Sequence, residues 1–276
     1  MPALDEVRHY YDRNTSSFLR TGQGGQAIHR AVWGPGVTTR DEAFAYLDGL
    51  LAGLVAQRPA PRVLDLGCGV GASLRRLAKR SDLHGVGVTL SPVQAQFAQA
   101  EFTRAGLGER LRCVEGSFTA LPAELGLFDA AFSIEAFIHS PSADAYLAEA
   151  AKHLKPGGVL ALIDDFPTDA PETARSRRWL HEVRTGWLAN TLESPPQLAT
   201  LAARYGLSLR RDEDLTPYLE LRRPRDLLLS AVMSVGRYLP VRSPLWRSWV
   251  GGNALQLALQ AGVLAYRFLV FEKTAP

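Results

Sequence analysis

Two side chains that can move a proton lie four residues apart near the middle of the chain, Glu135 and His139. They follow the apolar run 128–134, which predicts a buried strand that ends just before Glu135. If this segment turns helically, residues at i and i+4 share a face, so both groups point to the same side. Carboxylates and imidazoles are common general bases, and both residues are therefore candidate catalytic groups. His29 is a further candidate base.

A second segment whose residues could form a functional site, residues 63–71, reads Val-Leu-Asp-Leu-Gly-Cys-Gly-Val-Gly. A short apolar run that ends in an acid and continues into glycines predicts a buried strand, a tight turn and a helix start. Glycines at such a turn let a ligand approach the backbone closely, although they also serve plain packing. The spacing differs from the dinucleotide fingerprint Gly-x-Gly-x-x-Gly, and the absence of Gly-Lys-Ser/Thr excludes a phosphate-binding P-loop.

The set Asp65, Gly67, Gly69 and Gly71 resembles the first motif of the class I S-adenosylmethionine (SAM) methyltransferases. The resemblance implies SAM as the methyl donor, S-adenosylhomocysteine as the product, and a glycine loop beneath the methionine end of SAM. Pro156-Gly157-Gly158, which precedes a further apolar run, agrees with this family.

The end of the second expected strand resembles one subgroup of that family. Most members carry Asp or Glu there, whereas this chain reads Gly87-Val-Thr89-Leu90-Ser-Pro-Val-Gln94. The pattern Gly-x-Thr-Leu-Ser-x-x-Gln is similar to cyclopropane-fatty-acid-type, tocopherol-type and terpenoid C-methyltransferases. In those relatives the Thr-Leu backbone and the Gln hold the ribose, and a plain solvated helix position is the alternative for Gln94.

The same resemblance extends to the adenine and carboxylate ends of SAM. Ser117 occupies the place of an Asp that meets the adenine amino group, and Phe118 would cover the adenine face. The N-terminal Tyr10-Tyr11-Asp12 resembles a lid segment that contacts the SAM carboxylate, with Tyr11 as the chosen contact. Both tyrosines could equally be core aromatics.

The stretch Glu135-Ala-Phe-Ile-His139 resembles the Glu-Ala-x-x-His of small-molecule methyltransferases. In some O-methyltransferases the His is the base, and in some prenyl-diphosphate C-methyltransferases the Glu accepts a proton from a carbocation. The alternative is that Glu135 organises the loop and His139 packs on SAM. For the acceptor, the sequence suggests four residues: His29, Trp33, Tyr218 and Arg222.

The elements that must position these residues alternate regularly after residue 62. Strands are expected at 63–66, 83–89, 111–115, 128–134 and 159–164, with helices at 72–79, 91–105 and 142–153. Such βα units predict an α/β fold, a Rossmann-like parallel sheet with helices on both faces, and ligands at the carboxyl edge. Beyond 166 we expect helices at 173–192, 194–205, 227–238 and 246–261, and strands at 208–214 and 265–271.

The expected division of the chain has three parts. Residues 1–60 form an N-terminal helical lid, residues 61–166 and 263–276 the SAM-binding core, and residues 167–262 a helical lobe for the acceptor, inserted after the fifth strand. The last 106 residues carry 15 Lys and Arg against 9 Asp and Glu, and 14 of those cations are Arg. Arginine binds phosphate and carboxylate well, but a solvated arginine face is an equally plain explanation.

Composition narrows the function classes. An apolar content of 46% and a charged content of 21% are typical of a globular protein. Two cysteines imply no disulfide framework, and no Cys/His spacing suggests a metal site. No apolar stretch is long enough for a membrane span, so a cytoplasmic location is expected. There is no basic stripe with interleaved aromatics, which argues against a nucleic-acid partner, while the oligomeric state, a homodimer included, stays open.

These observations favour a SAM-dependent methyltransferase that acts on a small, largely apolar metabolite. C-methylation of an isoprenoid-like acceptor, including a diphosphate-bearing one, is the main hypothesis. O-methylation of a polyketide-like or aromatic hydroxyl in natural-product biosynthesis is the alternative. A non-catalytic SAM-binding protein is the hypothesis from a different class.

Overall fold

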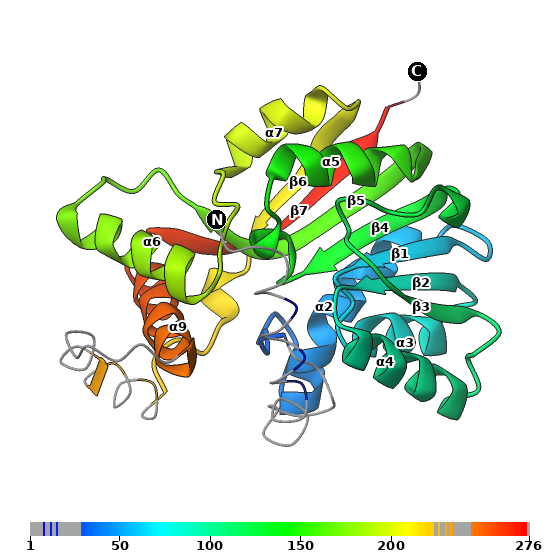
Figure 1. Ribbon diagram of the computed structural model, residues 1–276, viewed down its shortest axis with the longest axis horizontal. Coiled ribbons are helices and arrows are strands. Elements are labelled where there is room, and N and C mark those ends of the chain that lie inside the picture. Colours follow the sequence, from blue (N-terminus) through cyan, green and yellow to red (C-terminus); the bar gives the residue numbers. More distant parts are fainter. Residues whose placement is uncertain are drawn as a thin grey trace.

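The computed structural model describes residues 29–223 and 244–274, together with residues 8, 12, 15, 226, 230, 232 and 233. Its centre is a seven-stranded sheet with the order β3-β2-β1-β4-β5-β7-β6 (Figure 1). The strands are β1 Arg62–Leu66, β2 His84–Thr89, β3 Leu111–Glu115, β4 Phe128–Ile134, β5 Leu154–Pro167, β6 Leu207–Asp214 and β7 Leu264–Lys273. The first five strands are parallel, and β7 runs antiparallel between β5 and β6. The expected Rossmann-like α/β fold is confirmed.

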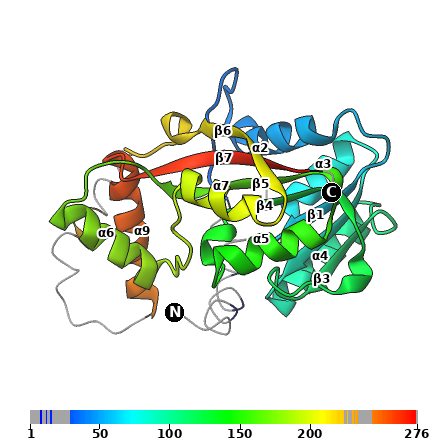
Figure 2. The same cartoon turned by 90° about the horizontal axis from the view of Figure 1, so that it is seen from above.

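Helices cover both faces of the sheet, because neighbouring strand residues point to opposite sides. Val63, Ala130 and Ile163 face a core shared with α2 Arg40–Val55, α3 Ala72–Arg80 and α4 Pro92–Arg104. Leu64, Ala131 and Leu162 face the opposite core, which is shared with α5 Ala143–Lys152 and α7 Pro195–Ala203. In Figure 2, α2 lies on one side of the strands and α5 and α7 on the other.

The helices begin where the sequence supplies caps. Thr39 and Glu42 form a capping box at α2, and the Ser91 side chain accepts from the Gln94 backbone N–H at α4, with Pro92 as the first helical residue. These caps fix the direction in which each helix leaves the sheet edge. Since the strand order reverses between β1 and β4, ligands are expected at the carboxyl ends of these two strands.

Two helices, α6 Ala174–Gly186 and α9 Pro244–Gln260, form a separate lobe beyond the carboxyl ends of β4 and β5 (Figure 1). They meet at glycines: a Cβ on Gly186 would lie 2.3 Å from the Arg247 carbonyl oxygen, and one on Gly251 would lie 2.5 Å from the Trp187 nitrogen. The two backbones therefore touch directly, as small residues at a helix crossing allow. Within the described part of the chain, no helix combines the length and apolar character needed to cross a bilayer.

The structure differs from the expected organisation in two places. The helix expected to reach residue 192 ends at Gly186, because Leu188 adopts a positive φ of 57° and the next residues bond to the loop after β4. The expected lobe of residues 167–262 also contains β6 and α7, which belong to the sheet and its helical layer, and α2 of the expected lid packs on the sheet. Most of the helix expected at 227–238, and most of the first 28 residues of the expected lid, lie outside the described residues.

The glycine loop after β1 is built from left-handed backbone. Gly67, Gly69 and Gly71 have φ values of 89°, 53° and 71°, which other residues adopt only with strain. A Cβ on Gly71 would also lie 2.6 Å from the Phe102 ring, so this glycine lets α3 pack closely on α4. Packing, rather than contact with a ligand, explains Gly71.

We predict that Gly71→Ala lowers the free energy of unfolding more than Gly106→Ala does. Gly106 has a similar φ of 69° but no atom within 4 Å of its missing Cβ, so its replacement costs only backbone strain, about 1–2 kcal/mol. Gly71→Ala adds the collision with Phe102, about 1–3 kcal/mol more. Urea denaturation of both variants measures the difference, and equal losses would contradict the packing role.

Candidate functional site

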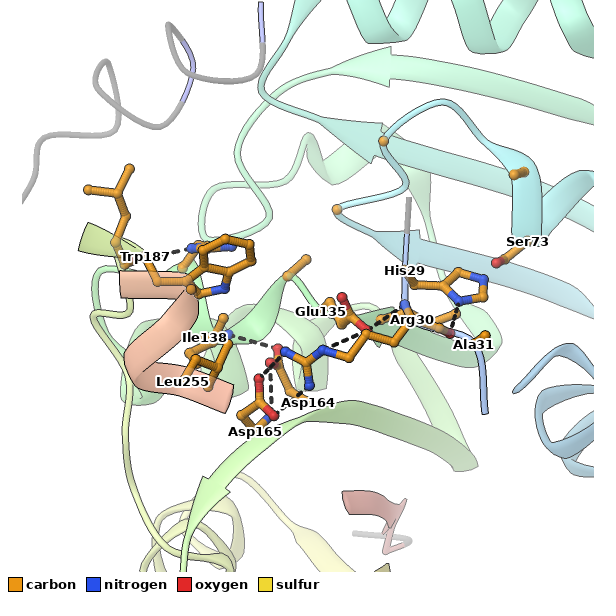
Figure 3. Close-up of a pocket in the computed structure, with 18 of the residues that line it drawn as sticks. His29, Arg30, Ala31, Ser73, Glu135, Ile138, Asp164, Asp165, Trp187 and Leu255 are labelled. Atoms are coloured by element: carbon orange, nitrogen blue, oxygen red, sulfur yellow. Dashed lines mark hydrogen bonds and ion pairs between the residues drawn. The ribbon is translucent and has the colours of Figure 1, made fainter. Parts of the chain in front are cut away.

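One cavity of about 820 Å³ lies at the carboxyl ends of the parallel strands and continues beneath the lobe. Figure 3 shows its central part, with Glu135, Asp164 and Asp165 at the strand ends, His29 and Ser73 at one side, and Trp187 and Leu255 at the other. The polar end is formed by the loops after β1, β2 and β3, and the apolar end by α6, α9 and residues 219–221. Such a cavity can hold two ligands side by side, which is what a group-transfer reaction requires.

The glycine loop forms the floor of the polar end. Gly67 and Gly69 line the cavity, and the backbone N–H groups of Gly67 and Cys68 both donate to the Val88 carbonyl, at 2.9 and 3.0 Å. A Cβ on Gly67 would lie 2.4 Å from the Ala136 Cβ. Gly67 therefore allows the loops after β1 and β4 to close around the same space.

Thr89 and Gln94 lie together in this end of the cavity. The Thr89 hydroxyl donates to Gln94 Oε1 at 2.8 Å, and both side chains are buried. The Gln94 amide nitrogen has no hydrogen-bond partner among the described residues. A buried amide donor without a partner is costly, so a ligand acceptor is expected beside it. The hydroxyl groups of a ribose fit this position, and the residues present thus suit SAM.

The remaining predicted cofactor residues fall into three groups. Asp65, Leu90 and Phe118 line the cavity, and burial, together with the nearby Asp48, raises the pKa of Asp65. Ser117 does not line it: its hydroxyl lies 2.8 Å from that of Thr119. Tyr11 lies outside the described residues, although its neighbour Asp12 accepts a hydrogen bond from Ser91 at the start of α4.

The centre of the cavity is organised by Arg30, which no motif had indicated. Its two terminal nitrogens donate to the two carboxylate oxygens of Asp165, each at 2.7 Å, and its guanidinium stacks over the Tyr266 ring. Burial opposes the charge on Arg30, but Asp165 and Glu135 outweigh it and raise the pKa of the guanidinium. The bidentate geometry makes this a strong, directional pair inside the protein.

Glu135 follows β4 and is held in place by Arg30 and Tyr266. Its Oε1 accepts hydrogen bonds from the Arg30 backbone N–H and from the Tyr266 hydroxyl, both at 2.9 Å. Glu135 has a positive φ of 50°, a strained conformation that costs roughly 1–2 kcal/mol for a residue with a side chain. The expected helical turn from 135 to 139 is wrong, because only Phe137–His139 form a short 3₁₀ turn, yet Glu135 and His139 both line the cavity.

The two histidines of the cavity differ in what their ring nitrogens do. His29 Nδ1 donates to the Arg30 carbonyl at 2.9 Å, and its Nε2 lies 3.1 Å from a nitrogen of Arg76, which can only donate. Both nitrogens of His29 are thus committed. His139 Nδ1 donates to the Leu188 carbonyl at 3.1 Å, which places the lone pair of the ring on Nε2. Burial lowers the pKa of both rings, so both are neutral near pH 7.

Asp164, next to Asp165 at the end of β5, is a third carboxyl group in the cavity. It accepts backbone hydrogen bonds from Ile138 at 3.0 Å and from Asp165 at 2.9 Å, and it forms no ion pair within the described part of the chain. Burial and the neighbouring Asp165 raise the pKa of Asp164 well above its usual range. By accepting the hydrogen bond from the Ile138 backbone, Asp164 fixes the loop that carries His139.

The apolar end of the cavity only partly matches the predicted acceptor residues. Of the four, only His29 lines the cavity, and it lies beside Ser73, away from Trp187 and Leu255. Trp33 packs beside Phe44, Tyr218 packs against the sheet core, and Arg222 is exposed. Arg223 lines the cavity instead, paired with Asp226 at 2.8 Å and Glu220 at 3.6 Å. The walls are made by residues that the sequence did not single out, namely Ile138, Trp187, Leu188, Leu219, Leu221, Trp249, Leu255 and Leu259.

Comparisons with known proteins agree with this geometry. A family described as "Methyltransferase domain" matches residues 63–158. The chain is 32% identical over 196 residues to 24-methylenesterol C-methyltransferase 2 of Oryza sativa subsp. japonica, spanning 69% of this chain and 53% of that protein. It is 30% identical over 219 residues to 27-O-demethylrifamycin SV methyltransferase of Amycolatopsis mediterranei, spanning 79% of each. Thus the chain covers about half the length of the sterol relatives that it matches.

Solved structures share the fold along nearly the whole chain. A cyclopropane synthase from Mycobacterium tuberculosis has a TM-score of 0.78, with 22% identity over 99% of both chains. This likeness shows a shared fold.

We predict that Arg30→Met lowers the free energy of unfolding by about 3–5 kcal/mol, because it leaves the buried Asp165 without its cation. The exposed pair of Arg177 and Glu172 offers a matched control, and Arg177→Met should cost less than about 1 kcal/mol. Chemical denaturation measures both. Similar small losses in the two variants would show that Arg30 does not hold the cavity together.

Proposed function

The chain belongs to the class I SAM-dependent methyltransferases, and on that premise we propose that it methylates a carbon atom of an uncharged, lipophilic, isoprenoid-like acceptor. SAM is the cofactor of this family, and the glycine loop, Thr89 and Gln94 would hold it. When bound, SAM supplies an electrophilic methyl group. The following arguments concern the acceptor.

The observation that carries the proposal is the charge of the cavity wall. Six described acidic residues line it, against two arginines: Asp65, Glu135, Asp164, Asp165, Glu220 and Asp226, with Arg30 and Arg223. Each of these arginines already pairs with carboxylates of the wall. Burial raises the pKa of Asp65 and Asp164, so these two add less negative charge than the other four. Among the described residues of the wall, both arginines are already paired when a diphosphate arrives, whereas developing positive charge on an acceptor carbon would be stabilised by the remaining carboxylates.

The apolar end of the cavity supports a lipophilic acceptor. Leucines and two tryptophans form most of the wall beneath the lobe, and the carboxyl groups lie where this apolar part meets the cofactor end. The printed activity of the sterol relatives concerns acceptors of the same character, a largely apolar molecule methylated at carbon. The expected diphosphate-bearing acceptor is therefore less favoured than an uncharged one.

For this reaction the protein needs only to align the acceptor with the methyl group and to remove a proton. With SAM bound, a carbon of the acceptor double bond would take the methyl group from sulfur, and S-adenosylhomocysteine would be released. The cation that results loses a proton, which restores the double bond. Glu135 is suited to accept that proton, because Arg30 and Tyr266 hold its Oε1 and fix the carboxylate at the cavity centre.

A specific observation also supports the alternative, O-methylation. The lone pair of His139 lies on Nε2 in a ring kept neutral by burial, which suits a base that takes a proton from a hydroxyl group. The rifamycin relative, which this chain matches over 79% of its length, carries an O-demethylated acceptor in its name. C-methylation and O-methylation can be distinguished by the product that forms and by whether Glu135 or His139 is required for turnover.

The first test offers the full chain SAM together with geraniol, geranyl diphosphate or a phenol. We expect C-methylated geraniol, identified by mass spectrometry and NMR, with kcat/KM at least about tenfold higher than for geranyl diphosphate. Preference for the diphosphate would contradict the charge argument, and an O-methylated phenol as the main product would favour the alternative. SAM binding without transfer to any acceptor, measured by calorimetry, would support a non-catalytic binding protein.

The second test replaces Glu135 by Gln, which keeps the size and the acceptor atom for Arg30 and Tyr266 but removes the proton-accepting charge. We predict that kcat falls by about 10²-fold or more while the Kd of SAM stays within about twofold. Glu109→Gln, at an exposed site away from the cavity, is the matched control. Unchanged kcat in Glu135→Gln, with loss in His139→Gln, would transfer the role of base to His139.

A further inference from the structure

The two cysteines of the chain lie side by side, although they are 45 residues apart in the sequence. The sulfur atoms of Cys68 and Cys113 are 3.5 Å apart, which is a contact between two thiols rather than a bond, and both thiols are free. Cys68 belongs to the glycine loop and lines the cavity, whereas Cys113 lies on β3 and is not among the lining residues. Both residues are half-buried.

A glycine on β2 allows this contact. Gly87 pairs with Asp65 of β1 on one side and with Cys113 of β3 on the other. A Cβ on Gly87 would lie 2.7 Å from the Cys68 sulfur and 2.9 Å from the Cys68 Cβ. The Cys68 side chain therefore packs against the bare backbone of Gly87 and reaches the neighbouring strand.

A bond between the two sulfurs would draw the glycine loop toward β3. Cys113 is fixed by the strand pairing of β3 with β2. Cys68 is held by hydrogen bonds of the loop, in which its N–H donates to the Val88 carbonyl at 3.0 Å and its carbonyl accepts from the Gly71 N–H at 2.9 Å. Since the sulfurs of a disulfide are about 2.0 Å apart, Cys68 would have to approach β3. The glycines on either side of Cys68, which line the cofactor end, would move with it.

We propose that Cys68 and Cys113 are a thiol–disulfide pair, which a peroxide closes and which then weakens SAM binding. One sulfur attacks a peroxide oxygen, the O–O bond breaks, and a sulfenic acid and one water are formed. The other sulfur attacks the sulfenic sulfur, the S–S bond forms, and a second water leaves. Two thiols and one hydrogen peroxide thus give one disulfide and two waters. A dithiol reductant reopens the pair by exchange.

The test treats the full chain with hydrogen peroxide at about pH 8.5. The hydrogen bond with Cys113, together with burial, raises the pKa of the Cys68 thiol, so little reactive thiolate is present near neutral pH. We expect mass spectrometry to show one disulfide within the chain, with two hydrogen atoms lost from the intact mass. The Kd of SAM, measured by calorimetry, should rise about tenfold or more and return to its starting value with dithiothreitol.

Cys113→Ser is the matched control, because it keeps Cys68 and changes a residue that does not line the cavity. This variant cannot form the bond, so the Kd of SAM should rise no more than about twofold after the same treatment. Cys113→Ala serves the same purpose if the serine variant does not fold. An oxidised control that loses as much SAM affinity as the wild type would overturn the proposal, because modification of Cys68 alone would then be sufficient.

A second measurement uses the reciprocity of linked equilibria. If the disulfide weakens SAM binding tenfold, saturating SAM must favour the dithiol by the same factor, measured in a buffer of reduced and oxidised dithiothreitol. A chain that only gains oxygen atoms or bonds to a second chain would contradict the proposal. An internal disulfide that leaves the Kd of SAM unchanged would contradict it as well. No measurement here involves an acceptor, so these outcomes are independent of those for the proposed function.

Discussion

The half-buried guanidinium of Arg30 makes the ion pairs on which the arrangement of the cavity depends. It joins the segment before α2 to the ends of three strands, through Glu135 after β4, Asp165 on β5 and Tyr266 on β7. Three carboxyl groups at one sheet edge would repel one another and lose hydration. One cation that contacts two of these acids lets all three remain close to one another in an apolar setting. In such a setting their electrostatic interaction with a charge on the acceptor is strongest.

The cavity divides into two ends with different physical character. The cofactor end is made of backbone and short polar side chains on loops that follow β1 and β2, so its shape follows from strand order and glycine conformation. The acceptor end is made of large apolar side chains on a lobe that follows β5. Glu135, Asp164 and Asp165 lie at the boundary between the two ends.

The sequence predicted the fold and the position of the glycine loop well because their signals are local. Strands 111–115 and 128–134 have the predicted bounds, and the glycine loop, Ser91 cap and Pro92 stand where short patterns placed them. Arg30 and Tyr266 were missed, because they reach the cavity through contacts more than 100 residues apart in the chain. The face of α9 that lines the cavity was missed as well, because its position depends on the crossing with α6, about 65 residues away. The pair Asp164-Asp165 after an apolar run was the one signal that could have revealed part of this centre. Trp33 and Arg222 were chosen by residue type, which says nothing of the direction in which a side chain points.

The contact between Gly186 and Gly251 has a consequence for how this protein can change. Because the two helices touch through main-chain atoms, the angle at which they cross does not depend on the side chains that line the cavity. Residues on the inner face of α9 can then be exchanged without altering the frame that carries them, and without reaching the loops after β1 and β2. Acceptor range is in this sense an evolvable property, open to alteration one position at a time by natural drift or by directed evolution.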